Sequence, residues 1–417
     1  MKNHILQAVK ILNEITRDGT YSNIALNQND ASDMAYKLVY GTLEKYIQIN
    51  YIISKLIDKK TKNNILNYIR VGICAILIID NVPTYALVSE TVEAAKMGGK
   101  SAASGFINAV LKKVANNEYS LPSEGDKDYL SIKYSKPQWF IDRMLKEYGK
   151  NRTIEMLSEK EYEEEHIRVN ERLTTVDKVK SKLDRHGIRY TESKCGGLNC
   201  RLEHDVKTMF INGFITIQSP SSMLAAQALG VTGKSQVLDL CSAPGGKAIY
   251  ISELCPDAHI TACDIHPHRV ELIEKYAKRM KATNISTRVN DATCYQKSFD
   301  NAFDFVLVDA PCSCLGTYRK HPDVFLTRKD EDIETLSATQ KKIIDNAVKY
   351  VRRGGILVYS TCTLFKAENT EIRDYILNNY NFELEKMDIC YSNQGDLQIL
   401  PHKEYDGFYI AKFKRVK

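Results

Sequence analysis

The sequence predicts a multidomain protein with an all-helical N-terminal part, a small α+β module and a C-terminal α/β domain. Three observations support this prediction. The 417 residues suffice for two or three domains of ordinary size. Apolar residues recur with helical spacing before residue 120, whereas short β-branched runs alternate with amphipathic stretches after residue 216. A segment rich in Pro, Ser, Gly and charge at 121–130 suits a linker.

The N-terminal part, residues 1–125, is expected to be a helical domain. Ala8, Leu12 and Ile15 share one helical face. The segment 65–79 is apolar almost all round, as is typical of a central buried helix. These patterns alone predict no more than a generic helical bundle.

Residues 131–215 are expected to form the small α+β module, and residues 216–417 the α/β domain. In the module we expect helices at 136–149 and 174–188, strands at 166–170 and 214–218, and a solvated helix face at the acidic run 159–166. In the C-terminal domain we expect strands at 236–241, 259–264, 286–290, 303–309 and 355–361, with a further strand at 407–414. Such a doubly wound sheet gathers ligands at the carboxyl ends of its strands, so the residues after each strand are the ones to inspect.

Composition narrows the function classes. The net charge of +6 permits a polyanionic partner without demonstrating one. No window approaches the roughly 18 apolar residues of a membrane span, and the N-terminus lacks the pattern of a signal peptide, so we expect a cytoplasmic protein without a membrane partner. The close cysteine pairs Cys195/Cys200 and Cys312/Cys314 do not fit a two-pair CxxC pattern, so we expect no metal.

A glycine loop follows the first strand of the C-terminal domain. Glycines let the backbone approach a ligand, and the next helix N-terminus attracts an anion. The loop is not a Walker A motif, which would need Gly at Cys241 and Ser or Thr at Ala248. The residues predicted to bind a cofactor here are Cys241, Ser242, Ala243, Pro244, Gly245, Gly246 and Lys247.

Three carboxylates follow successive strands. Asp264 can accept both hydroxyls of a ribose, Asp291 can contact an adenine edge, and Asp309 ends the fourth strand. Any one of them could merely cap a helix. Together with the glycine loop they favour a nucleoside cofactor that also carries a carboxylate, such as S-adenosylmethionine.

Two cysteines follow the fourth and fifth strands, Cys312 and Cys362. C5 of cytosine is too weak a nucleophile to take a methyl group from a sulfonium, but a thiolate that adds to C6 activates it. Asp309 can hydrogen-bond the N3/N4 edge, and the second thiol can help release the adduct. Spacing alone does not say which thiol attacks. Cys314 and Cys241 lack this positional argument and are expected to be structural, although Cys241 lies in the cofactor loop.

With these motifs, the C-terminal two thirds resembles the Sun/Nop2-type RNA cytosine-5 methyltransferases, a class I Rossmann-like family. The matching motifs are CSAPGGK (241–247), ACDIHPHRV (262–270), NDATC (290–294), DAPCSCLGTYRKHPD (309–323) and YSTCT (359–363). The resemblance implies that Cys362 is the nucleophile, that Cys312 assists release, and that Asp309 is catalytic and contacts the cofactor.

The segments 38–43, 82–96 and 105–114 resemble the NusB-like RNA-binding domain. The whole chain is therefore similar to the bacterial 16S rRNA members of the family, which implies methylation of the cytosine numbered 967 in naked or partly assembled 16S rRNA. The module at 131–215 would position RNA. Two departures concern that role: Ser219 stands where Asp is common, and the segment before Arg168 lacks the usual Asn and Pro pair.

Arg319, Lys320 and His321 are the best-placed basic residues to hold a phosphate while the target base flips out, although ordinary surface charge would explain them too. Two alternative functions stay open. The chain could methylate tRNA by the same chemistry, or it could be a non-catalytic RNA-binding assembly factor that keeps the α/β domain for its shape.

Overall fold

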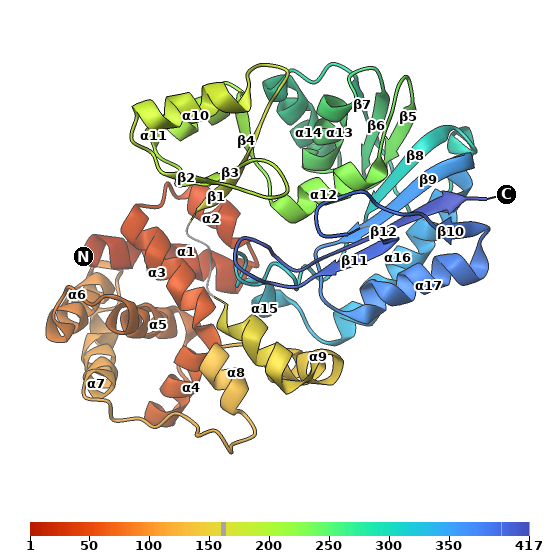
Figure 1. The fold of residues 1–417 in the computed structure, drawn as a ribbon. Helices are drawn as coiled ribbons and strands as arrows, with labels where there is room; N and C mark the ends of the chain where they lie inside the picture. The colour runs from red at the N-terminus through yellow and green to blue at the C-terminus, as the bar shows by residue number, and fades with distance from the viewer. Residues whose placement is uncertain (160–163, 393, 417) are drawn as a thin grey trace. The chain divides into compact units, whose positions relative to one another are not determined.

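The computed structural model describes residues 1–159, 164–392 and 394–416, and the chain divides into two compact units (Figure 1). The first unit comprises Met1–Ser158 and Tyr318–Asp330. The second comprises Glu159–Thr317 and Glu331–Lys417. The segment 318–330 therefore belongs to the first unit, although both of its sequence neighbours belong to the second. In the described part of the chain, no helix has the length and apolar character that a membrane span requires.

The first unit is helical, as predicted for residues 1–125. Its helices are α1 (Lys2–Asp18), α2 (Ser22–Gln28), α3 (Asp33–Glu44), α4 (Tyr46–Leu56), α5 (Asn63–Ile78), α6 (Thr84–Met97), η1 (Ser101–Ala103), α7 (Ser104–Ala115), α8 (Tyr129–Tyr134), α9 (Gln138–Ser158) and α15 (Val324–Thr327). The unit also takes in α8, α9 and the segment 318–330, which the sequence did not assign to the helical domain. The prediction of a central buried helix is confirmed, because α5 buries every residue from Asn67 to Ala75. Ile5, Leu12 and Leu38 pack in the same core.

Aromatic contacts hold the segment 318–330 in the first unit. The Phe140 ring of α9 lies 5.6 Å from that of Tyr318 and 5.0 Å from that of Phe325, centroid to centroid. The buried Lys136 ammonium lies 5.3 Å from the Tyr318 ring. The Tyr318 hydroxyl donates to the Met156 carbonyl at 2.8 Å. Edge-to-face ring pairs of this kind add about 0.5–1.5 kcal/mol each beyond their area burial.

The second unit begins with a small antiparallel sheet in the order β2-β3-β1-β4. Its elements are β1 (Glu165–Val169), α10 (Val176–Arg185), β2 (Tyr190–Glu192), β3 (Leu198–Cys200), α11 (His204–Ile211) and β4 (Ile215–Ile217). The expected helix face at 159–166 is wrong for Glu165 and His166, which open β1 and pair with β3. Burial of His166 and Ile167 against the sheet explains the strand. Residues 160–163 lie outside the described residues.

The larger sheet has the order β10-β12-β9-β8-β5-β6-β7, with β11 paired to β12. Its strands are β5 (Gln236–Asp239), β6 (His259–Asp264), β7 (Ile285–Val289), β8 (Phe303–Asp309), β9 (Val351–Thr361), β10 (Phe382–Leu384), β11 (Asp396–Ile399) and β12 (Phe408–Arg415). The accompanying helices are α12 (Pro220–Leu229), α13 (Gly246–Leu254), α14 (Pro267–Met280), η2 (Lys297–Phe299), α16 (Glu331–Tyr350), η3 (Lys366–Glu368) and α17 (Thr370–Asn379).

The predicted strands of the α/β domain are confirmed, including the last one, which forms β12. Strands β5 to β9 pair in parallel, and β10 to β12 add an antiparallel edge. The chain starts at β5, continues outward to β6 and β7, and then returns to the other side of β5 for β8 and β9 (Figure 1). This reversal creates a topological switch point beside β5, where α/β sheets bind ligands.

Candidate functional site

A cavity of about 290 Å³ lies at the carboxyl ends of β5, β6, β8 and β9. This volume is close to the lower end of the range for small-molecule sites, about 300 Å³. Seven of the twelve residues predicted for catalysis and cofactor binding line it. They are Cys241, Ala243, Asp264, Asp291, Asp309, Cys312 and Cys362.

The loop after β5 turns tightly before α13. The Ser242 amide donates to the Cys263 carbonyl at 2.7 Å, and the Gly245 amide donates to the Ser242 carbonyl at 2.7 Å. Gly245 has a φ of 105°, and a Cβ there would lie 3.1 Å from Ile273 Cγ2. A side chain would therefore be strained and crowded at this position. From this loop Cys241 and Ala243 line the cavity, while Ser242 and Gly245 shape the turn.

Asp264 is buried where β6 ends, as the strand pattern predicts. Its carboxylate accepts from the His266 amide at 3.1 Å and pairs with the Arg269 guanidinium at 3.3 Å. Arg269 also donates to the Ala243 carbonyl at 2.9 Å, which links the two strand-end loops. Asp291 accepts from the Thr293 hydroxyl at 2.7 Å and from its amide at 2.9 Å, and these bonds lower the pKa of Asp291.

Asn290 is a lining residue that the sequence reasoning missed. Its side chain is 4% exposed, and neither amide atom has a hydrogen-bond partner among the described residues. An orphaned buried amide costs about 1–3 kcal/mol unless a ligand or water pairs it. Together with the Asp264 carboxylate, this amide fits a ligand that offers hydroxyls and ring nitrogens, as a nucleoside does.

Lys247 and Asp309 form an ion pair between α13 and the end of β8. The Lys247 ammonium lies 2.7 Å from the Asp309 carboxylate, which also accepts from the Ser360 hydroxyl at 2.7 Å. Burial alone would lower the pKa of Lys247, but attraction to Asp309 raises it. The carboxylate of Asp309 is thus oriented on both sides and lines the cavity.

Asp239, the last residue of β5, is a second residue that the sequence reasoning missed. It is fully buried, and burial, reinforced by the charge of Asp309, raises the pKa of Asp239 to about 7. The sequence could have pointed to Asp239, because it ends the first strand of the domain. Asp264, Asp291 and Asp309 were predicted from the same kind of position.

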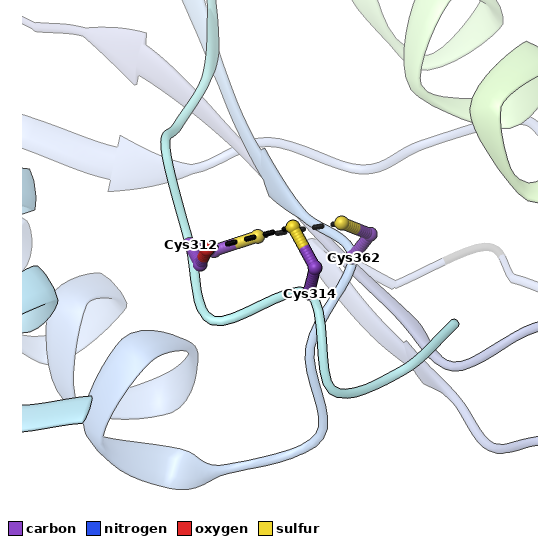
Figure 2. A group of neighbouring side chains, drawn as sticks. All are labelled: Cys312, Cys314 and Cys362. Carbon is purple, nitrogen blue, oxygen red and sulfur yellow. Dashed lines mark hydrogen bonds between the residues drawn. The ribbon is translucent and has the colours of Figure 1, made fainter. Parts of the chain in front are cut away.

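The two predicted thiols meet at the rim of the sheet. Cys312 follows β8, Cys362 follows β9, and their sulfurs lie 3.4 Å apart (Figure 2). The hydrogen bond with Cys312 lowers the pKa of Cys362, but the contact with Cys314, burial and the charge of Asp309 raise it further, so that it lies well above the ordinary value. The contacts with Cys314 and Cys362 and burial raise the pKa of Cys312 as well. Both groups are therefore neutral thiols at pH 7 in this state.

Cys314, which was expected to be structural, lies beside this pair. Its φ of 61° is in the left-handed region, and its thiol donates to the Cys312 carbonyl at 3.5 Å. The sulfurs of all three cysteines lie within 4.8 Å of one another. A buried acid anchors the loop between them, because Glu368 accepts from the Ser313 amide at 2.8 Å and from its hydroxyl at 2.6 Å.

The predicted RNA-binding residues lie in the first unit, whereas the cavity lies in the second. Arg319 is buried, Lys320 is half-buried and His321 is exposed. The burial of Arg319 was not expected of a surface phosphate ligand. Contact of the three residues with RNA stays a prediction.

The two departures from the family pattern have local explanations. Ser219 caps α12, since its hydroxyl accepts from the Ser222 amide at 3.3 Å, a role that Asp fills equally well. Arg168 is 2% exposed and pairs with Glu253 and Gln218 inside the second unit. Arg168 is thus part of the packing between β1 and the larger sheet's helices, whatever precedes it in the chain.

Comparison with known proteins gives matches to three successive parts of the chain. Residues 226–414 match the family model described as 16S rRNA methyltransferase RsmB/F, residues 4–116 match the NusB family, and residues 136–207 match the RsmF/B-like ferredoxin-like domain. These matches confirm the predicted fold class of a NusB-like bundle, a small α+β module and a Rossmann-like methyltransferase domain.

Individual relatives are similar over almost the whole length. A protein of Bacillus subtilis (strain 168) named probable ribosomal RNA small subunit methyltransferase B is 32% identical and is covered over 98% of each chain. A ribosomal RNA small subunit methyltransferase B of Proteus mirabilis is 32% identical over 80% of each chain. Among solved structures, PH0851 aligns with a TM-score of 0.85 at 24% identity, covering 99% of this chain and 98% of its own. NSun6 from Pyrococcus horikoshii with SFG aligns with a TM-score of 0.60 at 22% identity, covering 67% and 98%.

Proposed function

Because the chain belongs to the 16S rRNA methyltransferase RsmB/F family, with S-adenosylmethionine as methyl donor, we propose that it methylates C5 of a cytosine in 16S rRNA. The proposed target is the cytosine numbered 967. The observation that carries the proposal is the pair of sulfurs 3.4 Å apart, Cys312 and Cys362, in one cavity with Asp309. Methylation of an oxygen or an exocyclic nitrogen would need no thiol at that place.

The cofactor would be held by the residues at the ends of β5, β6 and β7. Asp264 would accept the ribose hydroxyls, Asp291 and Asn290 would contact the adenine edge, and the loop 241–247 would face the methionine portion. The orphaned amide of Asn290 and the cavity volume support this assignment. When bound, S-adenosylmethionine supplies an electrophilic methyl group on a sulfonium.

The chain's own residues would prepare the cytosine. A base, water in the simplest case, takes the Cys362 proton as the sulfur bonds to C6, and the electron pair of the C5–C6 double bond becomes available at C5 for the methyl group. Asp309, oriented by Lys247 and Ser360, would hold the N3/N4 edge as charge develops there. Water then takes the C5 proton, the electron pair of that C–H bond re-forms the C5–C6 double bond, and the C6–sulfur bond breaks with its electron pair returning to the Cys362 sulfur. Cys312, the hydrogen-bonding neighbour of Cys362, would assist this last step.

Substitution of each thiol tests the roles. Cys362→Ala should abolish turnover and form no covalent RNA adduct, whereas Cys312→Ala should accumulate protein attached to RNA. Cys390→Ala removes a partly buried thiol outside the cavity and serves as the matched control. The readouts are a denaturing gel for the adduct and labelled S-adenosylmethionine for turnover. An adduct with Cys362→Ala and none with Cys312→Ala would reverse the assignment.

Mapping by bisulfite sequencing tests the substrate. Incubation with unmethylated 16S rRNA should protect a single cytosine, at position 967. Methylation of tRNA alone would keep the chemistry and refute the rRNA target. Cofactor binding without methylation of either RNA would favour the assembly-factor alternative.

A further inference from the structure

Three thiols converge beside the cavity of the second unit. Cys312 and Cys314 lie on the loop after β8, and Cys362 comes from the separate segment after β9 (Figure 2). Their sulfurs all lie within 4.8 Å of one another. We propose that this three-thiol cluster is a binding site for a soft divalent cation, Zn²⁺, which ties up the thiols and switches the protein off.

The spacing suits that ion. Zn²⁺ binds thiolate sulfur at about 2.3 Å, so two sulfurs of a tetrahedral site lie about 3.8 Å apart. The Cys312 and Cys362 sulfurs are 3.4 Å apart, and the whole cluster fits within 4.8 Å. Shifts of under about 1 Å would bring all three sulfurs to bonding distance. All three residues also line the 290 Å³ cavity, which leaves room for water as the fourth ligand.

The donors are held in place before any ion arrives. Cys314 has a φ of 61°, a left-handed conformation that costs a residue other than glycine roughly 1–2 kcal/mol. The loop carrying it is fixed at one end by the bonds from Ser313 to Glu368. At the other end, the Gly316 amide donates to the Cys362 carbonyl at 2.9 Å, which ties this loop to the segment after β9.

Thiol chemistry gives the site its selectivity. Three sulfurs favour Zn²⁺ and Cd²⁺ over Mg²⁺ and Ca²⁺, which prefer oxygen ligands. Each thiol must lose its proton to bind the ion, so binding should release protons and tighten as the pH rises.

The expectation from sequence, that the protein holds no metal, considered only cysteines close together in the chain. The third ligand comes from another strand end. The inhibitory consequence rests on the proposed function, since a metal-bound Cys362 cannot add to cytosine C6. Binding of the ion does not depend on that function.

Cd²⁺ titration of the reduced full-length protein tests the site, because thiolate-to-Cd²⁺ charge transfer is visible in the ultraviolet. One tightly bound ion per chain is expected. Loss of an outer-shell partner weakens metal binding about 10- to 100-fold, so Cys314→Ser and Cys362→Ser, which remove direct ligands, should each weaken it at least that much. The matched control Cys390→Ser, with a thiol of similar exposure outside the cavity, should bind as the wild type does.

A second measurement uses the wild-type chain and so does not depend on the folding of a variant. One equivalent of Zn²⁺ should slow alkylation of Cys312, Cys314 and Cys362 together, as mapped by mass spectrometry, while the exposed Cys294 keeps its rate. Unchanged Cd²⁺ affinity in Cys314→Ser, or protection of cysteines outside the cluster, would overturn the proposal. Neither experiment contains RNA or cofactor, so failure here leaves the methyltransferase assignment to its own tests.

Discussion

Asp239 stores a free-energy cost at the centre of the larger sheet, and Asp239→Asn should release it. The carboxylate is 0% exposed, and burial raises its pKa from 3.8 to about 7. In the folded protein the group therefore keeps its proton up to about pH 7, whereas in the unfolded chain it loses the proton near pH 3.8. The amide of Asn has the same shape and no charge to bury.

The sign and size follow from linkage. Between pH 3.8 and about 7 the folded state binds more protons than the unfolded state, so this group makes the free energy of unfolding fall as the pH rises. At 1.36 kcal/mol per pH unit, the cost is about 1.5 kcal/mol at pH 5 and reaches its full value of about 4 kcal/mol near pH 7. The cost vanishes below pH 3.8, where both states are protonated.

The assay is thermal unfolding of wild type and Asp239→Asn in buffers from pH 5 to pH 8. The variant should gain stability at pH 8, and the gain should shrink by more than half at pH 5. The control is Asp257→Asn, an exposed acid in the loop before β6, which should change little at either pH. Equal gains at pH 5 and pH 8, or a loss of stability at pH 8, would refute the reasoning.

Two further substitutions probe the same domain. Lys247→Met should destabilise the second unit by about 2–3 kcal/mol in thermal unfolding, below the 3–5 kcal/mol typical of broken buried pairs, because Asp309 is 30% exposed and water can take up part of its charge. A loss under about 0.5 kcal/mol would mean that the pair contributes as little as a surface ion pair. Gly316→Ala would place a Cβ 2.1 Å from the Gly407 carbonyl oxygen and 2.8 Å from that of Cys362, both rigid backbone. It should cost about 3 kcal/mol or more. The control Gly105→Ala meets nothing within 4 Å and should be neutral or stabilising, and equal stability of the two variants would show that the loop after β8 can move aside.

The strand-end residues were predictable because buried parallel strands have a simple sequence pattern. Buried β-branched runs located β6 and β8, and the polar residue after each run, Asp264 or Cys312, had to lie at one edge of the sheet. The cavity contains most of the residues identified in this way.

What the sequence did not reveal depends on non-local packing. Cys314 reaches the thiol pair through a left-handed backbone conformation, which no spacing rule anticipates for cysteine. Arg319 is buried in a segment whose Tyr318 and Phe325 rings pack on Phe140, 178 and 185 positions earlier in the chain. The run of basic residues 319–321 suggested that Arg319 is a surface ligand for phosphate, but its burial depends on tertiary contacts that the local sequence does not show.

The division into units also has a practical consequence for dissecting the protein. The boundary crosses the chain at 158/159, 317/318 and 330/331. The second unit is therefore discontinuous in sequence, because the segment 318–330 interrupts it and belongs to the first unit. A fragment that starts at residue 159 would keep Tyr318 and Phe325 but lose Phe140 and Lys136, on which they pack. It would expose an aromatic surface a few residues after Cys314. A methyltransferase fragment that stays monomeric in solution therefore requires replacement of the segment 318–330. Deletion of the N-terminal helices alone should cause aggregation.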